Sequence, residues 1–146
     1  MKIIFDYNRT IFDPNTQELY PGVFKLLKQL SINHDLFLIS KNEFGRRETL
    51  DNLGIIDFFQ KIFFVENKTI EIFKKVSKNN KETLIIGDRI RGEIVIGNKL
   101  NFITVWLKQG KFSNEEPINE EQKPKYIIND ILELKKIIKK YEKQKN

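Results

Sequence analysis

Acidic and hydroxyl side chains follow three short apolar runs of this sequence, each at the point where a strand would end. The pairs are residues 3–5 followed by Asp6, residues 36–39 followed by Ser40, and residues 83–86 followed by Gly87 and Asp88. Apolar runs bounded by turn-forming residues are typical of buried strands. Because ligands bind beyond the carboxyl ends of the strands in open α/β sheets, we expect Asp6, Ser40 and Asp88 to share one site.

Helix and strand patterns alternate along the rest of the chain. The expected helices carry the stripe Val23, Leu26, Leu27 and Leu30 and then cover about residues 43–53, 69–78 and 89–100; further strands cover residues 61–65 and 102–107. This alternation predicts a mostly parallel sheet with helices on both faces, which is a Rossmann-like three-layer α/β/α sandwich.

The length of 146 residues is that of one ordinary domain with a substantial core. We expect residues 1–110 to form the core of this domain. Residues 111–125 include two prolines and no clear periodicity, which predicts an irregular surface excursion. A strand and a helix over residues 126–143 should then dock on the domain through Leu134, Ile137, Ile138 and Tyr141.

Composition restricts the possible chemistry. The chain has no cysteine, which excludes disulfides, a thiol nucleophile and thiolate metal sites. Its single histidine, His34, is expected on a loop at the opposite end of the strands from the site, so a histidine base is not expected. No apolar run approaches membrane-spanning length, and the opening run is too short for a signal peptide. We therefore expect a cytoplasmic protein that does not enter the membrane.

The formal net charge of +6 is compatible with nucleic-acid binding. Much of the excess lies near the carboxyl end, at Lys135, Lys136, Lys139, Lys140, Lys143 and Lys145, which alternate with apolar positions at helical spacing. That pattern favours a solvated helix face over a binding stripe. Six cations elsewhere would be the ones to test for a nucleic-acid role: Arg9, Arg46, Arg47, Arg89, Arg91 and Lys111.

In order and spacing, the polar residues resemble the four motifs of the haloacid dehalogenase-like (HAD) hydrolase superfamily. Asp6 and Thr10 match its Asp-x-Asp-x-Thr motif, Ser40 its Ser/Thr motif, Lys68 its lysine, and Gly87, Asp88 and Glu93 its acidic Gly-Asp-x-x-x-x-Asp motif. The resemblance covers about residues 1–110. Lys61, Lys74 and Lys75 are alternatives to Lys68, whose distance from Gly87 and Asp88 fits the family best.

The resemblance implies a magnesium-dependent phosphohydrolase in which Asp6 attacks phosphorus and forms an aspartyl-phosphate. Mg²⁺ would be bound by the Asp6 carboxylate, the main-chain carbonyl of Asn8 and Asp88, with Glu93 orienting its water molecules. Oxygen ligands suit this cation. The phosphate would be bound by Thr10, Ser40, Lys41 and Lys68.

Each of these residues also has an ordinary structural interpretation. Asp6 fits a strand-end Asx turn, Ser40 or Asp88 a helix cap, Lys68 an exposed lysine and Glu93 a first-turn acid. The joint pattern, with two aspartates after buried strands at the family spacing, favours a shared site.

One residue departs from the family pattern. Asn8 stands where the family's phosphatases have a second aspartate, which protonates the leaving oxygen and then activates water. Asparagine cannot exchange a proton at neutral pH, and such acid–base help is worth about 10²–10⁴-fold. Slow or atypical phosphate hydrolysis is the leading hypothesis. The alternatives are a catalytically impaired phosphate- or metal-binding module, and a protein that processes or binds nucleic-acid ends.

The family's cap domains are inserted after the first motif or between the second and third motifs. Residues 10–23 leave room only for a short flap, and residues 40–68 leave room for one helix and one strand. The resemblance therefore implies a capless member with an open site. Its phosphorylated substrate, whose identity the sequence does not reveal, would be bulky or would be covered by a neighbouring subunit of a homo-oligomer.

Overall fold

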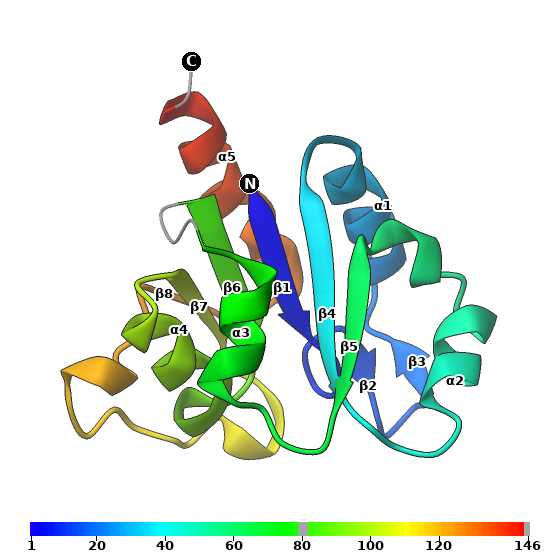
Figure 1. The fold of residues 1–146 in the computed structure, drawn as a ribbon, viewed down its shortest axis with the longest axis horizontal. Coiled ribbons are helices and arrows are strands. Elements are labelled where there is room, and N and C mark those ends of the chain that lie inside the picture. The colour runs from blue at the N-terminus through cyan, green and yellow to red at the C-terminus, as the bar shows by residue number, and fades with distance from the viewer. Residues whose placement is uncertain (79–81, 145–146) are drawn as a thin grey trace.

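The computed structural model describes residues 1–78 and 82–144, which fold around a six-stranded sheet (Figure 1). The strands are β1 (Lys2–Asp6), β4 (Asp35–Lys41), β5 (Lys61–Val65), β6 (Thr83–Gly87), β7 (Ile103–Leu107) and β8 (Tyr126–Ile128). Their order across the sheet is β5-β4-β1-β6-β7-β8, and every neighbouring pair is parallel. The strand order reverses between β1 and β6, which places a topological switch point at the middle of the sheet.

Helices cover both faces of this sheet. One face is covered by α1 (Val23–Asn33), α2 (Arg46–Asn52) and α5 (Leu134–Gln144), and the other by α3 (Ile70–Val76) and α4 (Val95–Lys99). Successive strand side chains point to opposite faces, so Ile3 and Phe5 join the first core cluster, whereas Ile4 joins the second. Burial on both faces explains why the strands read as continuous apolar runs.

The predicted three-layer α/β/α sandwich is confirmed, since the described strands of the main sheet are all parallel. The strand predicted over residues 61–65 coincides with β5. The predicted helix stripe of Val23, Leu26, Leu27 and Leu30 is buried in α1, and Leu134, Ile137 and Ile138 are buried in α5. The lysines of α5 are mostly exposed, as expected of a solvated helix face, although Lys145 lies outside the described residues.

Three predicted helices have different limits in the structure. The helix expected over residues 43–53 begins only at Arg46, because Gly45 adopts a φ of +76°, which glycine accepts without strain. The helix expected over residues 69–78 ends at Val76, and Ser77 is extended. The helix expected over residues 89–100 is a wide turn, Ile90–Ile94, interrupted at Gly92 before α4 begins.

Two irregular segments border the carboxyl ends of the strands. After β1, a small hairpin of β2 (Phe12–Asp13) and β3 (Glu18–Leu19) forms the expected short flap. The predicted irregular excursion contains two single 3₁₀ turns, Gly110–Phe112 and Glu120–Gln122. Among the described residues, no helix is both long and apolar enough to cross a bilayer.

Candidate active site

Three acidic side chains meet at the carboxyl ends of β1 and β6. Asp6 ends β1, Asp88 follows β6, and Glu93 returns from the helical turn after β6. All three are buried, and one carboxylate oxygen from each lies within 4.8 Å of the others. This acidic cluster (Asp6, Asp88 and Glu93) therefore occupies the switch point, where ligands bind in open α/β sheets.

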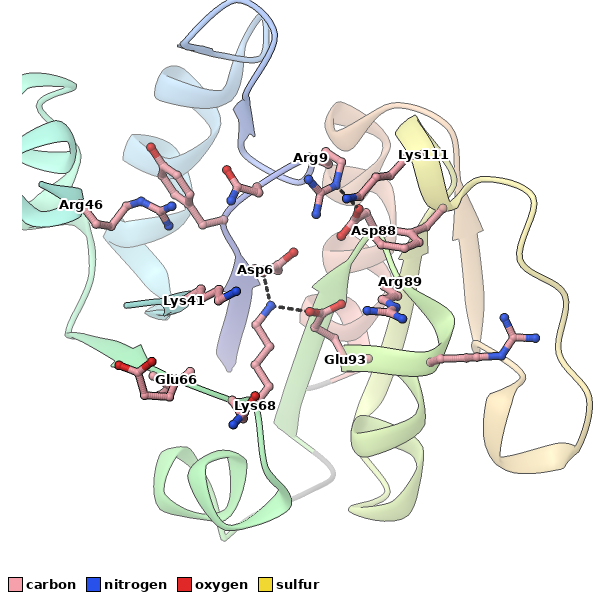
Figure 2. A pocket seen from close by; sticks show the side chains of 17 residues that line it. Asp6, Arg9, Lys41, Arg46, Glu66, Lys68, Asp88, Arg89, Glu93 and Lys111 are labelled. Atoms are coloured by element: carbon pink, nitrogen blue, oxygen red, sulfur yellow. Dashed lines mark hydrogen bonds and ion pairs between the residues drawn. The ribbon is translucent and has the colours of Figure 1, made fainter. Parts of the chain in front are cut away.

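Lys68 extends from the loop before α3 into the acidic cluster, as Figure 2 shows. Its Nζ donates hydrogen bonds to Oδ1 of Asp6 and, at 2.5 Å, to Oε1 of Glu93. Burial lowers the pKa of the Lys68 ammonium, but the charges of Asp6 and Glu93 outweigh this effect and raise it above its ordinary value. Lys68 therefore stays charged at neutral pH.

Asp88 has a different cationic partner. Arg9 Nε donates a hydrogen bond to Asp88 Oδ2 at 2.9 Å (Figure 2). Burial, followed by the charges of Asp6 and Glu93, raises the pKa of Asp88 to about 7, although Arg9 opposes the shift. Burial and the charge of Asp6 likewise raise the pKa of Glu93. The close approach of the three carboxyl groups therefore opposes their simultaneous ionisation, even beside Lys68 and Arg9.

The same cluster fits a divalent cation. Glu93 Oε2 is buried and has no hydrogen-bond partner within residues 1–78 and 82–144, and leaving such an oxygen unpaired costs about 1–3 kcal/mol or more for a charged group. Closely spaced carboxylate oxygens are the donors that Mg²⁺ prefers. Asp6, Asp88 and Glu93 could therefore hold a magnesium ion.

Gly87 makes room for one of these acids. A Cβ atom at this position would lie 2.6 Å from Oε2 of Glu93, a distance that real Cβ atoms do not approach. The glycine before Asp88 is thus needed for the close approach of the Glu93 carboxylate to the end of β6.

Two predicted phosphate ligands have other partners in the structure. Thr10 is fully buried, and its Oγ1 donates a hydrogen bond to Asp6 Oδ2 at 3.3 Å. Ser40 is also fully buried, and its Oγ accepts a hydrogen bond from Nη1 of Arg46. Their phosphate contacts stay predictions, and the geometry gives them roles in orienting Asp6 and Arg46.

Arg46 is a buried cation whose position the sequence did not reveal. It is 8% exposed, its Nη2 donates to Glu43 at 3.0 Å, and its guanidinium lies 4.1 Å from the centre of the Tyr7 ring. The Tyr7 hydroxyl is buried and has no hydrogen-bond partner in the described part of the chain. Burial raises the pKa of Tyr7 to about 12, so the phenol stays protonated.

A cavity of about 440 Å³ opens over these groups, which is a size that suits a small molecule. Its polar and charged lining comprises Asp6, Tyr7, Asn8, Arg9, Lys41, Arg46, Glu66, Asn67, Lys68, Asp88, Arg89, Arg91, Glu93 and Lys111. The lining includes Lys68 but none of the three alternative lysines considered from the sequence. Of the six cations proposed for nucleic acid, only Arg47 is missing from it; Arg47 lies instead over the Phe64 ring.

His34 lies away from this cavity, just before β4 begins. Its two ring nitrogens contact the amino group of Met1 at 3.1 Å and the Glu142 carboxylate at 2.7 Å. These contacts tie the amino end of the sheet to α5, in agreement with the expectation that His34 takes no part in the site.

Known proteins with similar sequences and structures point to one family. The model of the HAD-hydrolase-like family matches residues 68–134, a span that includes Lys68, Asp88 and Glu93. The chain is 30% identical over 135 residues to a glyceraldehyde 3-phosphate phosphatase of Methanocaldococcus jannaschii and 27% identical over 135 residues to one of Methanopyrus kandleri. These matches confirm the predicted resemblance to the haloacid dehalogenase-like hydrolase superfamily.

A solved structure of an HAD-hydrolase agrees with this resemblance. The magnesium-bound HAD-hydrolase of Bacillus subtilis superposes with a TM-score of 0.69 at 25% identity, over 82% of this chain and 56% of that one. Both of the phosphatase matches named above cover 85% of this chain but 58% of the relative. The chain thus spans little more than half the length of the curated relatives that it matches.

Proposed function

We propose that this protein is a magnesium-dependent phosphohydrolase that acts through an aspartyl-phosphate on Asp6, and that Asn8 makes it slow. The main support for this proposal is the position of Asp6 at the end of β1, beside Lys68, Asp88 and Glu93, in a cavity of about 440 Å³. The relatives named as phosphatases support the same reaction class.

The Asp6 carboxylate is oriented as a nucleophile requires. Thr10 hydrogen-bonds to Oδ2 and Lys68 to Oδ1, so both oxygens are held in fixed directions. A bond from Asp6 to phosphorus would form as the bond to the leaving oxygen breaks, and water attack on phosphorus would then release phosphate and restore Asp6. Lys68 would pair with the negative charge of the phosphoryl group throughout.

Mg²⁺ would be held by Asp6, Asp88 and the main-chain carbonyl of Asn8, with Glu93 beside it. When bound there, it would supply Lewis-acid neutralisation of the phosphate oxygens. On the other side of the cavity, Lys41 and Arg46 are the cations within the lining that can receive the remaining phosphate charge.

Asn8 sets the expected rate. Its side chain lines the cavity where the leaving oxygen would depart, yet an amide has no proton to give at neutral pH. The Tyr7 phenol, with its pKa of about 12, is a poor substitute acid. The leaving oxygen must then take its proton from water, which favours substrates with good leaving groups.

The test is phosphate release from an activated aryl phosphate with and without Mg²⁺, in wild type, Asp6→Asn and Asn8→Asp. We expect slow magnesium-dependent release by wild type and none by Asp6→Asn. Asn8→Asp should be about 10²–10⁴-fold faster on an alkyl phosphate, whose poor leaving group needs the acid. A smaller gain is expected on the aryl phosphate.

The presence of Asn8 in place of the family's aspartate also favours a second function. If wild type binds phosphate and Mg²⁺ but releases no product, while Asn8→Asp is active, the natural protein is a phosphate-binding module built on a disabled enzyme. If folded wild type and Asn8→Asp are both inert and neither binds Mg²⁺, the assignment of the site is wrong. Nucleic-acid binding, oligomer formation, the absence of a cap and a cytoplasmic location stay predictions.

A further inference from the structure

Three cations gather around one aromatic ring at the mouth of the cavity. The guanidinium carbons of Arg9 and Arg89 lie 5.3 Å and 4.6 Å from the centre of the Phe112 ring, and Nζ of Lys111 lies 5.1 Å from it. All four residues line the cavity that contains Asp6. We call this group, Arg9, Arg89 and Lys111 with Phe112, the cationic cluster.

The positive charge of this cluster is largely uncompensated. Within residues 1–78 and 82–144, neither Arg89 nor Lys111 forms an ion pair, and Arg9 shares its charge with Asp88 alone. A cation–π contact at an exposed site is weak and does not remove the repulsion between neighbouring cations. An anion placed between them would attract all three.

The cluster is assembled from three separate loops that contact one another. Arg9 follows β1, Arg89 follows β6, and Lys111 belongs to the 3₁₀ turn after β7. Gln109 Nε2 donates a hydrogen bond to the main-chain oxygen of Arg9 at 3.0 Å. Gly110 has a φ of +74°, which glycine adopts without strain, and its Cα side lies against the Arg9 side chain.

Arg9 connects the cationic cluster to the acidic cluster. Its guanidinium group contacts both the Asp88 carboxylate at 2.9 Å and the Phe112 ring. In Figure 2, Arg9, Lys111 and Arg89 lie on the Asp88 side of the cavity, opposite Lys41 and Arg46. A phosphate at Asp6 would therefore leave room for another anionic group of the same molecule on the Asp88 side.

We propose that the cationic cluster binds a second anionic group of the substrate, so that the preferred ligands are small bisphosphorylated molecules. This inference rests on the proposed function for the phosphate at Asp6, but the subsite itself is defined by binding. A hydrogen bond to a charged group contributes about 1.5–3 kcal/mol, so a second phosphate should improve recognition by roughly 10–100-fold.

The experiment compares butane-1,4-diol bisphosphate with butyl phosphate in the presence of Mg²⁺. Wild type is compared with Arg89→Met/Lys111→Met and with the control Arg47→Met. All three positions are exposed, and Arg47 also lies over an aromatic ring but outside the cavity, so folding should be unaffected. Calorimetry on Asp6→Asn, with and without the same double substitution, measures binding of both compounds without turnover.

We expect wild type to prefer the bisphosphate by roughly 10–100-fold in kcat/KM, after allowance for its two equivalent phosphates. The double variant should lose this preference, chiefly through KM, and should keep its activity on butyl phosphate within about threefold. Arg47→Met should keep the preference. A binding preference without turnover of either compound would support the subsite while contradicting the phosphohydrolase.

Equal binding of the two compounds by Asp6→Asn would overturn the subsite, even if wild type hydrolyses butyl phosphate. So would an equal loss for both compounds in the double variant. A third contrary result is a wild type that shows no bisphosphate preference but binds a single-stranded oligonucleotide through Arg89 and Lys111, since that outcome assigns the cluster to nucleic acid.

Discussion

The acidic cluster and the cationic cluster share one cavity but differ in how they are held. Asp6, Asp88 and Glu93 are buried at the ends of two central strands, and Lys68 and Arg9 offset part of their charge at hydrogen-bond distance. Arg89 and Lys111 are exposed side chains on loops, and they rest on an aromatic ring without acidic partners within residues 1–78 and 82–144.

This difference in burial suits the two clusters to different tasks, chemistry and ligand selection. Charges interact more strongly where water is excluded, so the buried acidic cluster suits the step in which charge moves between atoms. Exposed cations interact weakly with any one partner but discriminate among ligands by the number of anionic groups that they carry. Under the proposed function, the first cluster would determine the reaction and the second would determine which molecules react.

The largest effect should come from removing the lysine of the acidic cluster. Lys68→Met should lower kcat for an activated aryl phosphate by about 10²–10³-fold, because such a loss follows when one preorganised donor to the transition state is removed. Arg89→Met should change the same kcat less than about threefold. Steady-state kinetics on both variants checks this, with thermal unfolding to verify that each is folded. Equal losses of kcat in Lys68→Met and Arg89→Met would show that the two clusters do not have separate roles.

A smaller effect should follow from filling the space beside Glu93. Gly87→Ala should lower the free energy of unfolding by about 1–3 kcal/mol, since a Cβ there would lie 2.6 Å from Glu93 Oε2. Urea denaturation measures the loss. In a Glu93→Ala background the same substitution should cost much less, because the clashing oxygen is gone. An unchanged penalty would place the strain elsewhere.

The third effect concerns pH in the metal-free protein. Folding raises the pKa of Asp88 from its ordinary value to about 7, so the folded state holds this proton more tightly than the unfolded state. The free energy of unfolding should therefore fall as pH rises from about 4 to 7, by at most about 1.4 kcal/mol per pH unit for one proton.

Urea denaturation at several pH values in a chelator tests this dependence. Asp88→Asn should make the profile less steep, with Glu93, whose pKa is also raised, accounting for the remaining slope. Asp57→Asn, at an exposed position, should leave the profile unchanged. Added Mg²⁺ should stabilise the protein most at high pH, where the acids are charged. A metal-free stability that increases over this range in wild type but not in Asp88→Asn would contradict the assigned shift.

Much of the acidic cluster could be predicted because its signals are local. An apolar run that ends in a turn places Asp6 and Asp88 at strand ends, since parallel strands deliver their carboxyl ends to one edge. Lys68 and Glu93 were predicted from the spacing of a family motif. In the structure Lys68 hydrogen-bonds to Asp6, and a Glu93 carboxylate oxygen lies within 4.8 Å of one of Asp6. The late start of α2 at Arg46 and the interruption of the next helix at Gly92 were not predicted, because the conformations of Gly45 and Gly92 override helix periodicity.

The sequence by itself determined the layered fold and the residues at the strand ends, because burial on both faces of a parallel sheet leaves a direct record in apolar runs. Only the tertiary structure decided how those residues are paired. Arg9 meets Asp88 across 79 positions of the chain, and Gln109 meets Arg9 across 100. Arg46 is buried against Ser40 and Tyr7 although nothing in its neighbours marks it as different from exposed Arg47. Such contacts depend on where loops from distant strands come together, and neither periodicity nor composition encodes that.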